Sequence, residues 1–304
     1  MQESEVLDPA ATTTRAKTGA LPNLIIIGAP KCGTTSLHNY LNAHPEIAMA
    51  RVKEANFFLP EDGDDFMPPS NWGQGIDWYR THFDATARIR GESSPNYTHL
   101  PRSAGVAERM RSIIPDARLI YLVRDPFARI TSHYIHRCKA GRERRPFAEV
   151  LREQDSPYVQ PSLYFTQLQP FLAAFSRDRI LIESQERMLA QRRAVLRRIF
   201  GFLGVDDSVD RPEFDRLWEQ SEGKGRLYTL ALRTARAANT RRRPLPEFLR
   251  WPAQRILRAR VTGGRRVDRP TFDPDLREQL SERLRTEVES LRQLTGLEFA
   301  EWTL

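Results

Sequence analysis

Cysteine is nearly absent from this sequence, with only Cys32 and Cys138 among its 304 residues. Two thiols cannot build the disulfide framework of a small secreted domain, so a reducing compartment is the simpler interpretation. Long hydrophobic runs are also missing, since no segment approaches the roughly 18 consecutive apolar residues that indicate a membrane-spanning helix. Residues 1–17 contain three acidic side chains and no apolar stretch, unlike a signal or transit peptide. These absences predict a cytoplasmic protein with no membrane span.

The composition that remains is typical of a folded globular protein with an excess of positive charge. Hydrophobic residues make up 40% of the chain and charged residues 28%, close to the globular average. The 47 basic side chains outnumber the 39 acidic ones, giving a net charge of +8 that suits an anionic ligand. Residues 1–20 are polar and aperiodic, so we expect a disordered tail there and one folded domain over residues 21–304.

Short apolar runs alternate with helical patterns along the folded part. Leu24 to Ile27 is a continuous β-branched run, typical of a strand buried on both faces of a parallel sheet. A helix should follow, with Thr34, Thr35 and Ser36 as possible N-caps. The pattern repeats as helix 104–114, strand 118–123, helix 127–139, strand 179–182 and helix 188–203, before a final helix from 273 to 296. This alternation predicts a single α/β domain with a P-loop-like central parallel β-sheet flanked by helices.

The loop between the first strand and its helix is the strongest functional signal. It reads Gly28-Ala29-Pro30-Lys31-Cys32-Gly33-Thr34-Thr35-Ser36. A helix start offers free N–H groups and a positive dipole, Gly33 permits close approach of the backbone, and Lys31 adds a positive charge. The segment is therefore predicted to bind a phosphate-like anion. It does not match the nucleoside-triphosphate loop, because Lys31 precedes the second glycine instead of following it.

A second candidate anion site follows the strand 118–123. Arg124 ends that strand, and Ser132 comes eight residues later within the next predicted helix. A guanidinium and a hydroxyl at the carboxyl edge of the sheet could bind a second phosphate. Pairing of Arg124 with Asp125, or capping of the strand by Arg124, is an equally simple interpretation.

Together these segments resemble the PAPS-dependent sulfotransferase family, where PAPS is 3′-phosphoadenosine 5′-phosphosulfate. Residues 30–37 are similar to the 5′-phosphosulfate loop of the family, and residues 124–134 to its 3′-phosphate motif. In motif style the sequence is closest to the carbohydrate, heparan-sulfate-like and bacterial branch. The resemblance implies PAPS as co-substrate without a metal, and implies cofactor contacts from the following residues. These are Lys31, Cys32, Gly33, Thr34, Thr35, Ser36, Arg124 and Ser132, with Lys224, Gly225 and Arg226 resembling a basic loop that closes over the nucleotide.

The same resemblance implies a catalytic pair, Lys31 and Glu54. Residues 53–58 are similar to the segment of the glycan branch that carries a glutamate base, which would take the proton of the acceptor hydroxyl. Asn56 and Ser93 depart from that branch, which usually has histidine and lysine at these positions. Glu54 could instead be a structural partner of Lys53 or an arginine, and the base could be a histidine, His82 or His99.

Other functions are compatible with parts of the sequence. A small-molecule kinase or nucleotide hydrolase of the same fold is the main alternative, although the misplaced lysine disfavours it. A nucleic-acid-binding module would need aromatic residues among clustered basic ones, and the arginine-rich stretch 226–266 has few. His133 and His136 share a helix, but no further ligand lies at metal-binding spacing. We therefore expect no metal, no nucleic-acid partner and a hydroxyl-bearing acceptor: a glycan, a lipid or a natural-product small molecule.

Overall fold

A computed structural model of the chain describes residues 19–216, 218 and 267–304. In this part of the chain a parallel sheet has the strand order β2-β3-β1-β4-β5. The strands are β1 (Leu24–Gly28), β2 (Ile47–Met49), β3 (Ile89–Ser93), β4 (Arg118–Val123) and β5 (Ile180–Ser184). The predicted α/β fold with a central parallel sheet is therefore confirmed.

The apolar run from Leu24 to Ile27 forms the central strand β1 and lies in the core. Leu24 lies opposite Gly91 of β3 on one side and opposite Arg118 of β4 on the other. All of its residues are buried, as are those of β5. A strand enclosed on both faces needs apolar side chains in both directions, which explains why the sequence shows a continuous run rather than alternation.

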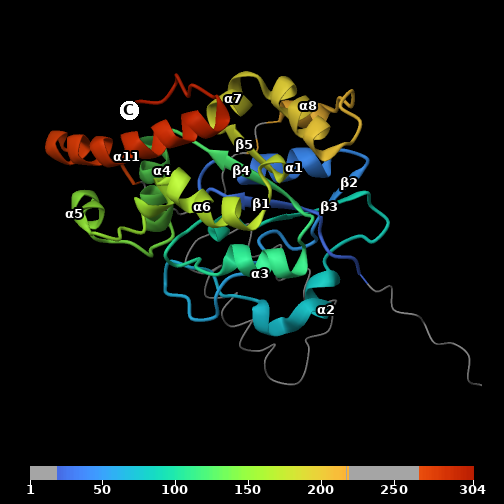
Figure 1. Ribbon diagram of the computed structural model, residues 1–304. Helices are drawn as coiled ribbons and strands as arrows, with labels where there is room; N and C mark the ends of the chain where they lie inside the picture. The colour runs from blue at the N-terminus through green and yellow to red at the C-terminus, as the bar shows by residue number, and fades with distance from the viewer. Residues whose placement is uncertain (1–18, 217, 219–266) are drawn as a thin grey trace, which may run out of the picture.

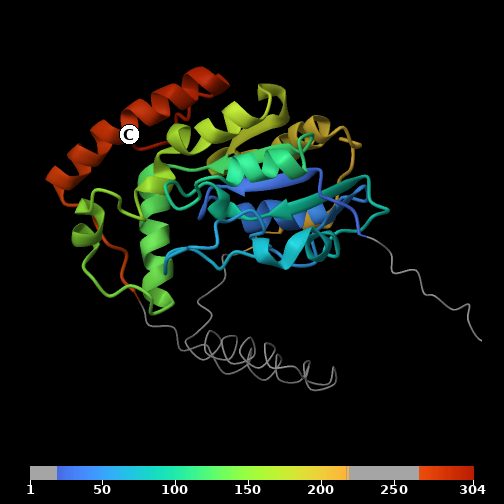
Figure 2. The ribbon, with the colours of Figure 1, turned by 60° about the horizontal axis from the view of Figure 1, so that its bottom comes forward.

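Helices cover both faces of this sheet (Figures 1 and 2). The helices α1 and α8 lie on one face, α3 and α6 lie on the other, and α11 packs along α6. Their bounds are α1 (Thr34–Asn42), α2 (Gly75–Arg80), α3 (Val106–Ile113), α4 (Pro126–Lys139), α5 (Phe147–Arg152), α6 (Tyr164–Ala174), α7 (Gln185–Ala190), α8 (Arg192–Leu203) and α11 (Pro274–Thr295). Helix α4 stands across the carboxyl end of the sheet, where ligands of such folds bind (Figure 2).

Two local predictions were wrong. The first helix is not capped by a threonine or serine: Gly33 occupies the N-cap position in a left-handed conformation, with φ of 88° and no side-chain hydrogen bond. The helix predicted over 188–203 is two helices, because Gln191 leaves the helical conformation and becomes the N-cap of α8. The first correction matters for function, since it leaves the start of α1 without a competing side chain.

The C-terminal helix α11 follows its prediction closely. Asp273 caps its first turn by accepting from the N–H groups of Asp275 and Leu276, and Gly296 ends it in a left-handed conformation. An apolar stripe along the helix is buried, and Leu284 at its centre is fully inaccessible; the stripe consists of Leu276, Leu280, Leu284, Val288 and Leu291. Glu287 fixes the helix to α6 by accepting from both the N–H and the hydroxyl of Thr166, at 2.9 and 2.6 Å.

Several sequence predictions lie outside the described residues. These are the disordered tail over its residues 1–18, the basic loop Lys224-Gly225-Arg226 and the arginine-rich stretch 226–266. Among the helices that the structure describes, none combines the length and apolar character needed to cross a bilayer.

Candidate active site

The two predicted anion motifs meet where the chain connections diverge. The segment after β1 leads toward β2 on one side of the sheet, and the segment after β4 leads toward β5 on the other. Such a switch point opens a crevice at the carboxyl ends of the strands. Arg124, from the end of β4, donates from Nη1 to the main-chain oxygen of Lys31, 3.3 Å away in the loop after β1. The motifs therefore form one site.

The loop after β1 bends sharply and leaves the start of α1 without a side-chain cap. Lys31 and Gly33 both have positive φ, 72° and 88°, so the chain turns sharply just before α1. The first N–H groups of a helix have no partner within the helix, and here no side chain caps them. Gly33 also lies close to Gln185, since a Cβ atom at this glycine would come within 3.3 Å of the Gln185 amide nitrogen. An anion can therefore approach the start of α1 without steric obstruction from residue 33.

Positive charge is concentrated around Lys31 and is poorly neutralised. Burial, and then the nearby charge of Arg124, lower the pKa of Lys31 to about 8. Arg129, from α4, is fully buried and acts in the same direction on Lys31. Among the described residues neither arginine forms an ion pair with a carboxylate. An anion bound here would be attracted by these positive charges and would in turn raise the pKa of Lys31.

The other loop residues differ in what they can offer. Cys32 is turned into the core, where its thiol lies 3.8 Å from the Tyr164 hydroxyl and burial raises its pKa to about 11. Its N–H donates to Ala29, so Cys32 shapes the loop from within. The Ser36 hydroxyl donates to the main-chain oxygen of Trp218 at 3.2 Å. Thr34 is buried and Thr35 exposed at the start of α1.

The second motif is held in place by a dense set of hydrogen bonds around Asp125. Its carboxylate caps α4 by accepting from the N–H of Ala128 at 2.7 Å, and it accepts from both the N–H and the hydroxyl of Thr303. Its own N–H donates to Glu186, which also accepts from the Trp302 indole. The alternative that Arg124 pairs with Asp125 is therefore not what the structure shows. Asp125 is used to fix the start of the helix that carries Ser132.

Glu54 lies on a tightly bent loop after β2, beside the end of β3. Its N–H donates to the main-chain oxygen of Ser93 at 3.1 Å, and both Glu54 and Asn56 have positive φ, 64° and 51°. Lys53 Nζ lies 2.6 Å from Glu54 Oε1, so the ion pair considered from the sequence is present. The Glu54 side chain is still 39% exposed, and the carboxylate acts on the charge of Lys31. Glu54 therefore shares the site with Lys31 and remains accessible.

His82 and His99, which the sequence offered as alternative bases, both lie in surroundings that lower their pKa. His99 is fully buried, and burial lowers its pKa to about 3. His82 packs edge-on against Trp78, and its pKa is lowered by burial and by Arg51. His136 instead lies within electrostatic range of both Lys31 and Glu54; its side chain is exposed, and partial burial followed by the positive charge of Lys31 lowers its pKa.

Of the residues of α4 near the site, sequence reasoning passed over Arg129 and considered His136 only as a metal ligand. Their spacing carried a usable signal, because Ser132 and His136 are four residues apart and so share one face of the helix. A fully buried arginine such as Arg129 is likewise unusual unless it serves an anion or a polar network, and here it donates to the Ser162 hydroxyl and the Tyr158 main-chain oxygen.

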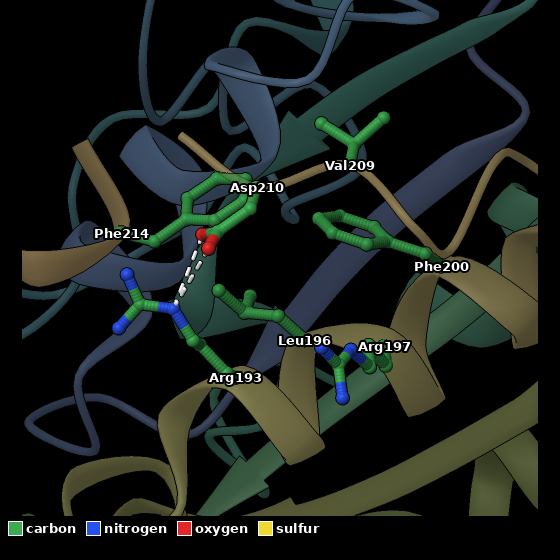
Figure 3. Close-up of a pocket in the computed structure, with 7 residues that line it drawn as sticks. All are labelled: Arg193, Leu196, Arg197, Phe200, Val209, Asp210 and Phe214. Carbon is green, nitrogen blue, oxygen red and sulfur yellow. Dashed lines mark hydrogen bonds and ion pairs between the residues drawn. The ribbon is translucent and has the colours of Figure 1, made fainter. Parts of the chain in front are cut away.

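A separate pocket lies between α8 and the segment 209–214 (Figure 3). Arg193 is held there by Asp210, at 3.1 Å, and also pairs with Asp215. None of the predicted site residues lines it, so this pocket is not the candidate site. In the ranges 19–216, 218 and 267–304, no group of three or more His, Cys, Asp or Glu side chains is arranged to hold a metal ion.

Comparison with known proteins decides the family. The sulfotransferase domain family matches residues 21–292. The chain belongs to this family. The recognition of a PAPS-dependent sulfotransferase from residues 30–37 and 124–134 is thereby confirmed, and the kinase alternative is not favoured.

Individual relatives agree with this assignment. Heparan sulfate glucosamine 3-O-sulfotransferase 3B1 of Mus musculus is 28% identical over 247 residues, covering 76% of this chain and 60% of the relative. The membrane-associated sulfotransferase kil1 of Dictyostelium discoideum is 37% identical over 119 residues, 38% of this chain and 22% of the relative. A sulfotransferase structure from Alicyclobacillus acidocaldarius has a TM-score of 0.65 and 26% identity, covering 94% of this chain and all of that one. The chain thus spans less than two thirds of the length of these curated relatives.

Proposed function

We propose that this sulfotransferase transfers the sulfuryl group of PAPS to an acceptor hydroxyl, with the crevice between β1 and β4 as the donor site. The loop Lys31 to Ser36 would hold the 5′-phosphosulfate, and Arg124 with Ser132 the 3′-phosphate. The observation that carries this proposal is the contact of Arg124 with the main chain of Lys31, which joins two cationic motifs into one site. Lys224, Gly225 and Arg226 remain proposed donor contacts from the resemblance alone.

The proposed chemistry assigns Glu54 as general base and Lys31 as stabiliser of the leaving group. The acceptor oxygen forms a bond to sulfur, while the bond from sulfur to the oxygen of the 5′-phosphate breaks and leaves its electron pair on that phosphate. Glu54 takes the hydroxyl proton, and Lys31 balances the charge that develops on the leaving phosphate. The products are a sulfate ester and 3′,5′-adenosine bisphosphate. As in phosphoryl transfer, the protein contributes position and charge.

For the acceptor we propose a carbohydrate, or a glycosylated, lipid or natural-product hydroxyl. Support for sugar comes from the resemblance around Glu54 and from a relative named for glucosamine. Two neutral residues, Asn56 and Ser93, stand at the departures from the glycan branch, and the buried oxygens Asn56 Oδ1 and Ser93 Oγ have no hydrogen-bond partner within the protein. These positions favour an acceptor other than heparan sulfate itself. The cytoplasmic location stays a prediction.

Donor identity is tested by thermal stabilisation. The bisphosphate product should raise the melting temperature without added metal, because a ligand that binds only the folded chain stabilises it by mass action. ATP with Mg²⁺ at the same concentration should do less. A larger shift with MgATP than with the bisphosphate would refute the donor assignment.

The role of Glu54 is tested by Glu54→Gln in a screen of acceptors with PAPS, read by mass spectrometry. The variant should keep bisphosphate affinity and lose turnover by about 10²- to 10⁴-fold, the usual range for loss of a general base. His136→Ala is the comparison variant, because this histidine lies within electrostatic range of both Lys31 and Glu54. Near-normal turnover in Glu54→Gln, with loss in the histidine variant, would move the base to His136.

A further inference from the structure

A fully buried carboxylate, Glu92, lies at the end of β3 beneath the Glu54 loop. Both of its oxygens accept hydrogen bonds from hydroxyl groups: Oε2 from Tyr79, and Oε1 from Tyr97 and Ser94 at 2.6 and 2.5 Å. None of the ion pairs in the described chain involves Glu92. A buried carboxylate is costly unless its lone pairs are satisfied. Here three hydroxyl donors provide that satisfaction.

Two of these hydroxyls connect Glu92 to the loop that carries Glu54. The Ser94 oxygen accepts from the N–H of Asn56 at 3.0 Å, and the Tyr97 oxygen accepts from the N–H of Phe58 at 3.3 Å. A hydroxyl that donates its hydrogen to a carboxylate turns its lone pairs toward other donors. Glu92 therefore orients both hydroxyls as acceptors for the main chain of the loop.

The loop requires such external anchors. Glu54 and Asn56 both adopt the left-handed backbone conformation, which residues other than glycine adopt only uncommonly. A backbone of this kind persists only where its surroundings fix it. Asn56 itself provides one anchor by donating from Nδ2 to the main-chain oxygen of Glu54, and Asn71 donates to the oxygen of Ala55.

We propose that Glu92 is a positioning residue for catalysis: through Ser94 and Tyr97 it holds residues 54–58 in the bent conformation that presents Glu54 to the acceptor. Glu92 itself is too deeply buried to touch the substrate. The inference rests on the proposed role of Glu54 as the base.

Two tyrosines provide a matched test. Tyr79 and Tyr97 donate to the same carboxylate, but only the Tyr97 oxygen also accepts from the loop. Tyr97→Phe should lower kcat at saturating substrates about three- to tenfold, the factor that corresponds to one lost hydrogen bond. It should leave the bisphosphate Kd unchanged. Tyr79→Phe should keep kcat within about twofold of the parent, because its ring can still stack on Phe57 of the loop and the lost hydroxyl bonds only to Glu92, not to a main-chain N–H of the loop.

Ser94→Ala is a second, smaller change, made at the hydroxyl that links Glu92 to the N–H of Asn56. If Tyr97→Phe does not fold, Ser94→Ala can be compared with Tyr79→Phe in its place. It should also lower kcat without changing the bisphosphate Kd. A purely structural role predicts instead that all three variants lose melting temperature and donor affinity together. Equal kcat values for Ser94→Ala, Tyr97→Phe and Tyr79→Phe would overturn the inference.

Combination with Glu54→Gln separates this inference from the proposed function. If Tyr97 acts through Glu54, then Tyr97→Phe should cause no further loss of kcat in the Glu54→Gln background. Full activity of Glu54→Gln alone would refute the base assignment. An inactive Glu54→Gln, combined with a Tyr97→Phe variant no different from Tyr79→Phe, would leave the base in place and reject the role of Glu92.

Discussion

Binding of the bisphosphate should make Lys31 take up a proton. The pKa of Lys31 is lowered from 10.5 to about 8, first by burial and then by Arg124. A phosphate bound against the ammonium group would favour its charged form and raise that pKa again. Because the phosphates of the ligand are already fully ionised at pH 8, their own titration should not obscure the uptake.

The expected magnitude follows from the two protonation states. With a pKa of about 8 before binding and well above 9 after it, the chain should take up about 0.1, 0.5 and 0.9 protons per ligand at pH 7, 8 and 9. The apparent Kd should rise about fivefold between pH 8 and 9. Before binding, the lowered pKa favours neutral Lys31 in the folded chain, so its contribution to stability increases as the pH rises from about 8 toward 10.5.

Isothermal titration calorimetry in two buffers of different ionisation enthalpy measures this uptake directly. Lys31→Met removes the titrating group and should abolish the buffer dependence at pH 8, whereas Lys31→Arg should keep binding constant between pH 8 and 9. A wild-type enthalpy independent of the buffer at pH 8, or a buffer dependence that survives in Lys31→Met, would refute the reasoning.

Three further predictions concern donor binding and stability. Arg124→Ala should weaken bisphosphate binding about 10- to 100-fold in titrations and leave kcat at saturating donor unchanged. Lys31→Ala should weaken binding and also lower kcat. Equal effects of the two variants on kcat would contradict the separate roles assigned to Arg124 and Lys31. Thr303→Val removes the 2.9 Å bond from its hydroxyl to Asp125 and should raise the bisphosphate Kd about twofold or more. An unchanged Kd would mean that the C-terminal segment around Thr303 does not support the donor site. Leu284→Ala empties a fully buried position of α11 and should lower the free energy of unfolding by about 2 to 5 kcal/mol in urea; a loss below about 1 kcal/mol would show that the stripe repacks.

The sequence was most informative where one physical signal dominates. The strand 118–123 was predicted with the bounds that the structure gives to β4, because its side chains face a core on both sides and form an unbroken apolar run. Strand β3 had no such signal, since Arg90 and Glu92 interrupt it. The burial of Glu92 depends on hydroxyls from three other positions, and no local pattern reports their meeting.

Backbone conformation was the other limit. The positive φ values of Lys31, Glu54 and Asn56 are not encoded by glycine at those positions. They arise because contacts with neighbouring strands fix the loops, as for the N–H of Glu54 on Ser93. The sequence could therefore indicate which residues form the site, whereas the turns that aim them depend on tertiary contacts.

The strand order places the two donor motifs and Glu54 on different pairs of strands. Both donor motifs follow β1 and β4, which are hydrogen-bonded neighbours, so the span between the two anion sites is set by the spacing of adjacent strands. In the proposed function, that span would match the distance between the 5′- and 3′-phosphates of one nucleotide. Glu54 belongs to the other pair, on a loop beside β2 and β3. If Glu54 is the base as proposed, substitutions on that loop would change the acceptor without altering the spacing of the two donor motifs.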